Sequence, residues 1–585
     1  MKAALLSFSA FFWAAPAFAQ TADPLSPLPT TPQPAPAAPV AVPPVAQQPA
    51  VAVPTAVVPK DWRGVFDAID AGNWASARAG IATLPANILT PVALAELYTA
   101  RNSPVVDLAS IQSLMMQAPD LPQSEQLAAM AVRRGALTAP PFVQPKRLFN
   151  LGSAPVRYRA RPVTGEPSAD QLRAALEPFV DANDAAGAEA QLLTYAPTMS
   201  VEARAEAAQR VAWIFYVNGD DLNARRVSDT WRQGAQGDWA AHAAWVSGLA
   251  SWRLGDCNAA SHAFNQVAGM SQQRELRTGA LYWAARSEQA CGRPRSVAPL
   301  LKAAAANAES FYGLLARETL GMDTKLPADP HVHRDPSIDH LPNVQRAKEL
   351  VRIGETALAE EMLRHQAKIG SPAEHHALIQ LAKRLDLPAA QLWLANNGQW
   401  GAVADAADRY PNPQWRPLNG WRVDPALAFG HIVQESSFRR TAVSHAGAVG
   451  LMQVLPGTAD MISRNRGVPY SRGALTNPIY NLEFGQSFIE MMRRSSATAG
   501  QLPRVIASYN AGPLPVGRWA SINDKGDPLL WIESIPYWET RYYVPAVLRN
   551  MWVYQGLNRQ PTPTLKAMAE HHWPAFPTGQ TTLSH

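Results

Sequence analysis

From Asp61 to about Trp400 the apolar positions recur at helical spacing, in short Ala-rich segments separated by brief polar breaks. Apolar residues with a period of about 3.6 predict amphipathic helices, each with one buried face. Glycine permits the left-handed conformation that closes a helix, and a small residue lets paired helices approach. Such a glycine is followed five positions later by a small residue in Gly72 and Ala77, Gly219 and Ala224, Gly255 and Ala260, Gly292 and Val297, and Gly354 and Ala359. The pattern predicts helix hairpins.

The hairpin pattern repeats with a regular period. The three middle glycines recur at intervals of 36 and 37 residues, close to the period of about 34 residues in helix-hairpin repeats. We therefore expect a mainly all-α chain in which residues 61–400 form an α-superhelix. Residues 61–150 follow the pattern less clearly, and a Pro-rich interval from Pro140 to Pro167 separates them from the better repeats.

Large aromatic residues accompany the repeats at helix-compatible intervals. Aromatic side chains dominate core burial, so we interpret these residues as packing between helices. A platform on which sugar rings stack is the alternative interpretation. The residues are Trp213, Phe215, Tyr216, Trp231, Trp239, Trp245, Trp252, Tyr282 and Trp283.

A different helix begins at Asp424-Pro425. Aspartate can cap the free N–H groups of a helix, and proline at the first helical position loses no hydrogen bond. The helix places Leu427, Ala428, His431 and Ile432 on one stripe and ends at Glu435. Apolar surroundings raise the pKa of a carboxyl group, as a general acid near neutral pH requires. Glu435 is therefore the candidate catalytic acid.

A second catalytic carboxylate is not evident in this region. Sugar-cleaving enzymes commonly use two carboxyl groups, one as the acid and one as the base or nucleophile. The acidic residues between Glu435 and Tyr509, among them Asp460 and Glu483, fall inside helical patterns. One acid without a nucleophile suggests that the acetamido oxygen of an N-acetyl sugar attacks instead.

Four ordered motifs follow the candidate acid over about a hundred residues. They are Glu435-Ser436, Gly450-Leu451-Met452-Gln453, Tyr509-Asn510-Ala511-Gly512, and the run from Ile535 to Val544. In order and spacing they resemble the soluble lytic transglycosylases of the Gram-negative periplasm. The stretch from Phe311 to Ala316 also resembles part of the helical domain of that family.

The resemblance implies a fold, an activity and site residues. It implies a lysozyme-like catalytic domain over residues 401–556, which cleaves the MurNAc-β-1,4-GlcNAc bond of peptidoglycan without water and leaves a 1,6-anhydroMurNAc end. Glu435 would first protonate the glycosidic oxygen and then take the proton of the muramoyl C6 hydroxyl. Ser436 would orient Glu435. The other residues that the resemblance assigns to the glycan-binding groove are Ser444, Gln453, Tyr509, Asn510 and Glu539.

Some positions depart from the family pattern or have an open interpretation. Leu455 and Ser508 stand where methionine and alanine are common, and Trp538 is larger than usual. Arg541 and Tyr543 follow Glu539 in the expected last helix of the catalytic domain. They either stabilise the structure, with Arg541 pairing a carboxylate and Tyr543 filling core, or contact glycan directly.

The N-terminal residues predict export. A short basic start, an apolar run and Ala17-Phe18-Ala19 form a secretory signal over residues 1–19, and no cysteine follows for a lipid anchor. Residues 20–60 are a Pro/Ala-rich segment whose composition favours a disordered linker. We expect a soluble periplasmic protein. After Gly556 the chain becomes polar and Pro-rich, and residues 557–585 are expected to be a tail.

Composition limits the range of partners. The net charge of +5 over 585 residues is small, and Lys and Arg are scattered. This gives no indication of nucleic-acid binding, although a mild positive excess would help encounter with the carboxylates of peptidoglycan. We expect a monomer whose partner is the peptidoglycan glycan strand, with envelope proteins as further candidates.

Two groups of residues raise the question of cross-links or metals. Cys257 and Cys291 are the only cysteines, one repeat apart, and could form a disulfide in an oxidising compartment; two buried thiols are the alternative. A second group, in a Pro-punctuated loop without a partner motif, favours a solvated connection over a metal site. It comprises His331, His333, Asp335, Asp339 and His340. No metal and no cofactor are expected.

Two alternatives to a transglycosylase remain open at this point. A hydrolytic muramidase would need a groove that admits water. A non-catalytic helical-repeat scaffold could hold peptidoglycan or a partner enzyme, although it would have no need of a positioned acid.

Overall fold

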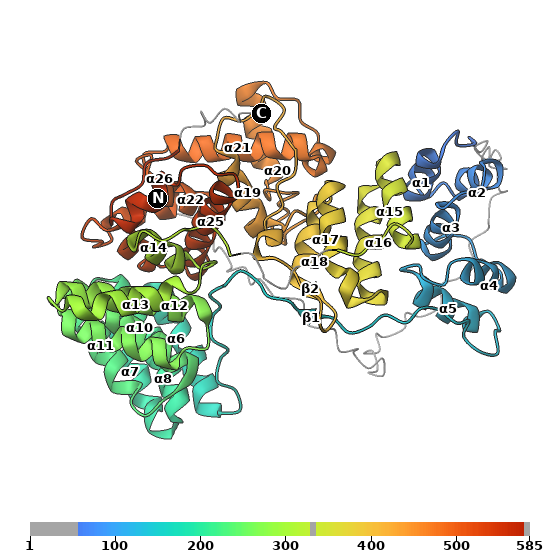
Figure 1. The fold of residues 1–585 in the computed structure, drawn as a ribbon. Coiled ribbons are helices and arrows are strands. Elements are labelled where there is room, and N and C mark those ends of the chain that lie inside the picture. The colour runs from blue at the N-terminus through green and yellow to red at the C-terminus, as the bar shows by residue number, and fades with distance from the viewer. Residues whose placement is uncertain (1–56, 328–334, 578–585) are drawn as a thin grey trace, which may run out of the picture.

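The computed structural model describes residues 57–327 and 335–577, and nearly all of its regular structure is helical (Figure 1). This confirms the mainly all-α prediction. The predicted signal sequence and most of the predicted linker lie outside the described residues. Within these residues no helix combines the length and the apolar character needed to cross a bilayer.

The first helices form a block around their own apolar core. Polar side chains begin several of them: the carboxylate of Asp61 accepts a hydrogen bond from the Gly64 N–H at 2.8 Å, and Asp107 does the same for Ser110. The helices are α1 (Trp62–Asp70), α2 (Trp74–Thr83), α3 (Thr90–Thr99), α4 (Leu108–Gln117) and α5 (Ser124–Arg133).

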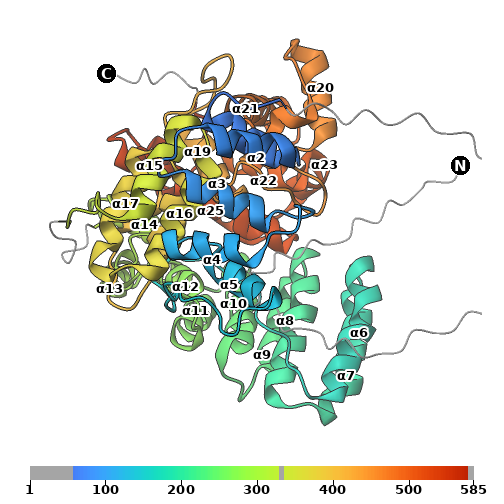
Figure 2. The same cartoon turned by 90° about the vertical axis from the view of Figure 1, so that its right-hand side faces the viewer.

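Four later helices complete this block. They are α15 (Pro342–Ile353), α16 (Thr356–Ile369), α17 (His375–Arg384) and α18 (Pro388–Asn396), with the short η2 (Pro372–Glu374) before α17. Apolar side chains from α1–α5 and α15–α18 share one core. Arg346 of α15 forms a salt bridge of 2.9 Å with Asp120. Figures 1 and 2 both place α15 and α16 beside the N-terminal helices.

The helices between these two groups form a second block of stacked hairpins. They are α6 (Pro167–Ala182), α7 (Ala185–Tyr195), η1 (Ala196–Thr198), α8 (Val201–Val217), α9 (Asp221–Trp231), α10 (Gly237–Arg253), α11 (Cys257–Met270), α12 (Arg274–Ala290), α13 (Pro294–Ala305) and α14 (Phe311–Thr319). Gly219, Gly255 and Gly292 end α8, α10 and α12 with φ of 84°, 78° and 69°. The left-handed turns predicted from the sequence are therefore present.

The superhelix does not follow the chain in simple order. The extended residues between α5 and α6 cross from one block to the other (Figure 1), and β1 (Phe149–Asn150) on this crossing pairs antiparallel with β2 (Asn397–Gly398). The chain then returns from α14 to α15, on the first block. Contacts between helices distant in sequence, which periodicity does not reveal, determine this arrangement.

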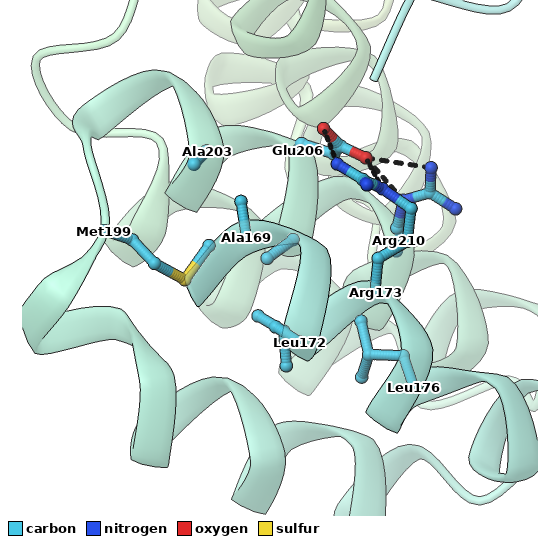
Figure 3. Close-up of a pocket in the computed structure, with 9 residues that line it drawn as sticks. Ala169, Leu172, Arg173, Leu176, Met199, Ala203, Glu206 and Arg210 are labelled. Carbon is cyan, nitrogen blue, oxygen red and sulfur yellow. Dashed lines mark hydrogen bonds and ion pairs between the residues drawn. The ribbon is translucent and has the colours of Figure 1, made fainter. Parts of the chain in front are cut away.

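A carboxylate buried in the second block joins its first helices. Glu206 of α8 lies 3.0 Å from Arg173 of α6 and 2.9 Å from Arg210 of its own helix (Figure 3). The cavity beside this group has a volume of about 10 Å³ and is lined mainly by apolar side chains. It is too small for any ligand beyond a water molecule.

The C-terminal helices form a third unit. They are α19 (Pro425–Glu435), α20 (Pro456–Arg466), α21 (Pro478–Arg494), α22 (Leu502–Ala511), α23 (Pro513–Arg518), α24 (Pro528–Glu533), α25 (Trp538–Leu557) and α26 (Pro563–Ala569), with the short η3 (Ala406–Arg409), η4 (Arg472–Thr476) and η5 (Trp519–Ser521). The long helix α25 packs against α19 and α22.

The expected tail after Gly556 is wrong for residues up to 577. Helix α26 packs against α14, and its Leu565 and Met568 are fully buried. Phe576 is also buried, and Ala575 pairs with Gln501 in an isolated β-bridge. The segment is polar and Pro-rich overall, but a few of its apolar side chains are buried against the rest of this unit.

Buried polar groups join the second block to the C-terminal unit. Arg157 makes two hydrogen bonds to Glu533, at 2.7 and 3.0 Å, and Tyr312 of α14 donates a third to the same carboxylate at 2.6 Å. Arg541 stacks its guanidinium 3.5 Å from the centre of the Trp213 ring and donates to the carbonyls of residues 535 and 536. Arg541 therefore stabilises the structure, by binding backbone carbonyls rather than the carboxylate expected from the sequence.

Candidate active site

Helix α19 carries Glu435 at its C-terminal end. The Asp424 carboxylate accepts a hydrogen bond from the Ala426 N–H at 2.9 Å, and Gln555 of α25 donates to its other oxygen at 2.8 Å. The Asp424 side chain thus both caps α19 and joins it to α25. After Glu435 the chain turns sharply, with left-handed φ of 51° at Ser437 and 65° at Phe438.

A glycine permits the close approach of α19 to α25. A Cβ atom built on Gly430 would lie 3.0 Å from the carbonyl oxygen of Val547 and 3.3 Å from the backbone nitrogen of Met551. Asn550 uses this proximity, because its amide donates to the Gly430 carbonyl at 3.1 Å. The contact brings the first turns of α25 beside the end of α19.

Tyr543 of α25 is the hydrogen-bond partner of the candidate acid. Its hydroxyl donates to Glu435 Oε1 at 2.5 Å. Burial raises the pKa of Glu435 to about 7; the bond from Tyr543 lowers that pKa, and the nearby Glu539 carboxylate raises it. Glu435 nevertheless keeps part of its surface exposed. Glu435 can therefore be protonated near neutral pH while remaining open to a substrate.

His431 lies one helical turn before Glu435 and is fully buried. Its Nδ1 is 2.7 Å from the Tyr543 hydroxyl, and its ring centroid is 4.5 Å from that of Tyr509. Burial lowers the pKa of His431 to about 3, so the ring is neutral at neutral pH. His431, Tyr543 and Glu435 thus form a continuous hydrogen-bonded chain.

Ser436 does not contact Glu435 as expected from the sequence. It follows the last residue of α19, is fully buried, and directs its hydroxyl back to the carbonyl of Ile432 at 3.4 Å. The side chain of the C-terminal residue of a helix and that of the residue after it point in different directions. Tyr543, which is distant in sequence, takes the orienting position instead.

Ser444 and Gln453 lie in the loop between α19 and α20. Ser444 Oγ accepts a hydrogen bond from the Ala448 N–H at 3.0 Å, which closes a tight turn. Gln453 has a left-handed φ of 47°, and its amide donates to the carbonyls of Ala442 and Gly450 at 3.1 and 2.7 Å. Both residues therefore have a structural role in the loop, and both remain partly exposed.

Tyr509, Asn510 and Glu539 lie near Glu435. The Tyr509 hydroxyl donates to the Met452 carbonyl at 2.7 Å, so α22 is joined to the loop. Asn510 donates to Glu539 at 3.2 Å and accepts from Thr540 at 2.6 Å. The exposed Glu539 is close enough to raise the pKa of Glu435. The structure thus brings together four of the residues expected from the sequence: Glu435, Tyr509, Asn510 and Glu539.

From the sequence alone the role of Tyr543 stayed open, and His431 had no expected role. Tyr543 belongs to the last motif, four residues after Glu539, so a helical projection of that motif could have placed both residues on one face. His431 appeared only as one member of an apolar stripe. A histidine within the apolar stripe of a helix is expected to be buried, and a buried polar side chain needs a hydrogen-bond partner. That position was the signal that could have identified His431.

Cys257 and Cys291 are bonded to each other, with Cα atoms 5.5 Å apart. The bond joins the start of α11 to the residue after α12, so it connects adjacent hairpins of the second block far from Glu435. Neither cysteine takes part in the candidate site.

A cluster of one histidine and two aspartates lies elsewhere, where α17 meets η3. His376, Asp405 and Asp408 bring ligand atoms within 4.8 Å of one another. The hydrogen bond that His376 donates to Asp408, together with the bond and charge of Asp335, raises the pKa of His376 to about 9. The protonated ring can form ion pairs with Asp335 and Asp408. Of the predicted histidine loop, His331 and His333 lie outside the described residues, and Asp339 pairs with Lys348 at 2.6 Å.

Comparison with known proteins places Glu435, Tyr509 and Asn510 within a defined domain. Residues 416–532 match the family model of the transglycosylase SLT domain. A putative soluble lytic murein transglycosylase of Haemophilus influenzae is 31% identical over 175 residues, which are 29% of this chain and 28% of that protein. The soluble lytic murein transglycosylase of Escherichia coli K12 is 28% identical over 255 residues, or 41% of this chain and 38% of that protein. The matches thus span well under half of these relatives.

Solved structures resemble the chain over most of its length. An inactive mutant of the lytic transglycosylase Slt from Pseudomonas aeruginosa matches with a TM-score of 0.54 at 19% identity, covering 86% of each chain. A 70-kDa soluble lytic transglycosylase in complex with bulgecin A matches with a TM-score of 0.56 at 17% identity, covering 88% of this chain and 98% of the other. The likeness shows that this chain has the same fold, a helical superhelix followed by a lysozyme-like domain.

Proposed function

We propose, from the premise that residues 416–532 form a transglycosylase SLT domain, that this chain is a lytic murein transglycosylase. It cleaves the bond between MurNAc and GlcNAc in peptidoglycan without water. The product carries a 1,6-anhydroMurNAc end. In chemical class the enzyme is a carbon–oxygen lyase that acts on a polysaccharide.

The observation that carries this proposal is the state of Glu435. A general acid works best when its pKa lies near the operating pH. Burial raises the pKa of Glu435 to about 7, while Tyr543 holds one carboxyl oxygen at 2.5 Å and leaves the other without a hydrogen bond among the described residues. Such a carboxyl group can give up a proton and take one back within the same reaction.

The proposed reaction uses Glu435 twice. The protonated carboxyl donates to the glycosidic oxygen as the bond from that oxygen to C1 of MurNAc breaks, and the acetamido oxygen of the same sugar stabilises C1. The carboxylate then accepts the proton of the C6 hydroxyl, whose oxygen forms the new bond to C1. The proton count balances because Glu435 ends the cycle protonated, and no water is consumed.

The residues around Glu435 would hold the glycan. Asn510 and the exposed Glu539 offer polar atoms near the acid, and the partly exposed Ser444 and Gln453 offer them in the loop after α19. We propose that these residues and Tyr509 bind the N-acetyl groups and hydroxyls of the two sugars. Ser436 is left out of this set because it is fully buried and turned away.

The same proposal fits an exported monomer that acts on the cell wall. The predicted signal sequence directs the chain to the periplasm, where peptidoglycan is accessible and disulfides persist. The bond between Cys257 and Cys291 suits that compartment. We propose periplasmic peptidoglycan as the substrate, with no cofactor.

Mass spectrometry of the products released from purified peptidoglycan by the mature protein tests the proposal. We expect anhydromuramoyl ends. Reducing ends would instead make the protein a hydrolytic muramidase, in which Glu539 is the second carboxylate to examine because it acts on the pKa of Glu435. No release, with the chain bound to peptidoglycan, would favour a scaffold.

A further inference from the structure

Tyr543 stands between two groups, and only one of them can receive its proton. Its oxygen is 2.5 Å from Glu435 Oε1 and 2.7 Å from His431 Nδ1. A phenol has one O–H donor and accepts through its oxygen. If Tyr543 donates to Glu435, then Nδ1 of His431 must carry a proton and donate to Tyr543. In the reverse arrangement Tyr543 donates a hydrogen bond to Nδ1, and a protonated Glu435 donates one to the Tyr543 oxygen.

The surroundings of His431 select between the two arrangements. The ring is fully buried, and its Nε2 has no hydrogen-bond partner in the described part of the chain. The reverse arrangement would place the ring proton on Nε2, as a buried N–H without an acceptor, which is rare in folded proteins. The first arrangement leaves only an unprotonated nitrogen in apolar surroundings. It also gives Tyr543 a charge-assisted bond to the Glu435 carboxylate.

We propose that His431 is a positioning residue whose Nδ1–H donates to Tyr543, makes the Tyr543 hydroxyl a permanent donor to Glu435 Oε1, and so keeps the transferable proton of Glu435 on Oε2. Nε2 has no partner through which the ring could exchange its proton, so the tautomer stays the same throughout the reaction. This inference rests on the proposed function of Glu435 as acid and base.

The arrangement serves both proposed steps. Oε2 has no hydrogen-bond partner among the described residues, and Glu435 is partly exposed, so this oxygen is the one open to substrate. In the first step the proton leaves from Oε2, and in the second Oε2 takes a proton back. Without His431 the Tyr543 hydroxyl could turn away and accept the proton of Glu435. That proton would then sit on Oε1, directed away from the glycan.

The loss of His431 also has a defined effect on the pKa of Glu435. The groups that face this carboxyl are Tyr543 and Glu539 from α25, Tyr509 from α22, and His431 of α19 through Tyr543. Removing the Nδ1–H donor weakens the bond that stabilises the carboxylate. It also permits a bond that stabilises the protonated form. Both changes raise the pKa, so the general acid stays protonated to higher pH.

The tautomer can be measured without any activity. NMR of the full chain labelled with ¹⁵N-histidine distinguishes Nδ1–H from Nε2–H, and the His431 signals are those missing in His431→Phe. We expect a neutral ring protonated at Nδ1 between about pH 5 and pH 8. A proton on Nε2 or a charged ring would overturn the inference, whether or not peptidoglycan proves to be the substrate.

The role in the reaction is tested by pH–rate profiles of four proteins: wild type, His431→Phe, Tyr543→Phe and the double variant. A hydrogen bond of ordinary strength predicts that His431→Phe lowers kcat about tenfold and moves the basic limb of the profile up by about one pH unit. In the Tyr543→Phe background the same change should leave the limb where it is. An equal shift in both backgrounds, or no shift in either, would mean that His431 only fills space.

His431→Asn is the conservative variant. Its amide N–H can donate to Tyr543, so we expect it to recover part of the lost kcat and a basic limb nearer to wild type. It is smaller than histidine, so it also guards against a failure of His431→Phe to fold. If a folded His431→Asn protein matched His431→Phe in both quantities, the donor role would be excluded.

Discussion

Glu435 needs surroundings that are apolar enough to keep it protonated near neutral pH. It must also be open enough to pass that proton to a sugar. The structure meets the first demand by burial and the second by leaving one oxygen without a hydrogen bond. The surrounding residues Tyr543 and His431 then decide which oxygen carries the proton. At the scale of single residues, the proposed reaction depends on which oxygen of Glu435 carries the proton.

Glu435→Gln is expected to abolish cleavage while preserving the fold. General acid and general base steps are each worth roughly 10²- to 10⁴-fold, and glutamine can perform neither. Product release from peptidoglycan measures the loss, with Glu349→Gln, at a partly exposed position of α15, as a matched control of the same chemistry. Cleavage near the wild-type rate in Glu435→Gln would remove Glu435 from the mechanism.

The same substitution has a pH-dependent effect on stability. The pKa of Glu435 in the folded chain, about 7, lies above its ordinary value of 4.5, so the native state binds more protons than the unfolded state between these values. The contribution of Glu435 to wild-type stability therefore falls as the pH rises from about 4.5 to about 7. Glutamine does not titrate, so denaturant unfolding should show Glu435→Gln more stable than wild type at pH 8 and not at pH 4. A difference that is the same at both pH values would contradict the raised pKa.

At the scale of elements, the site depends on how closely α19 and α25 pack. Tyr543 reaches both His431 and Glu435 only because Gly430 allows the two helix backbones to approach. The motifs name the residues on each helix but not the distance between the helices. That distance is determined at a position outside the motifs.

Gly430→Ala should therefore impair both stability and activity. The added Cβ would lie 3.0 Å from a backbone oxygen that cannot turn away, and such overpacking costs about 1–3 kcal/mol, only partly offset by the better helix propensity of alanine. Gly269→Ala on α11 is the control, because nothing lies within 4 Å of its added Cβ. Denaturant unfolding and the cleavage rate measure the effects. If Gly430→Ala is as stable and as active as Gly269→Ala, the close approach is not needed.

The bond between Cys257 and Cys291 is a second feature at this scale. It closes a segment with a sequence separation of 34 residues, and a bond over such a span stabilises by about 2–4 kcal/mol. A tryptic digest analysed without reduction should show the two cysteine peptides linked, and Cys257→Ser should lose about that stability without loss of cleavage. Free thiols in the exported protein would refute the bond.

At the scale of the whole molecule, Glu533 connects the helical block to the catalytic unit. It is almost fully buried and receives three hydrogen bonds, two from Arg157 and one from Tyr312. These partners come from parts of the chain more than 200 residues away. Through this contact the superhelix helps to stabilise the catalytic unit, and the two parts are not independent of each other.

Glu533→Gln should uncouple the two parts. Removing one partner of a buried ion pair costs about 3–5 kcal/mol because the other charge stays buried. Calorimetry should show a lower first transition and a split of one transition into two. The control is again Glu349→Gln, whose partner Arg352 has a side chain 67% exposed, and an exposed pair is worth at most about 1 kcal/mol. A single unshifted transition in Glu533→Gln would show that the two parts do not depend on this contact.

Local signals in the sequence determined a large part of this protein. Apolar periodicity and glycine spacing predicted the helices and the left-handed turns that end them. The motifs identified Glu435, and the apolar stripe of its helix predicted a raised pKa. These properties depend on residues within one or two turns of each other, so one stretch of sequence contains them.

Tertiary structure alone decided how these pieces meet. The return of α15–α18 to the first block, the packing of α26, and the replacement of Ser436 by Tyr543 as the partner of Glu435 all involve residues far apart in the chain. His431 looked like one more member of an apolar stripe until α25 placed a hydroxyl 2.7 Å from it. Such contacts depend on the packing of side chains over the whole core, which no local pattern encodes.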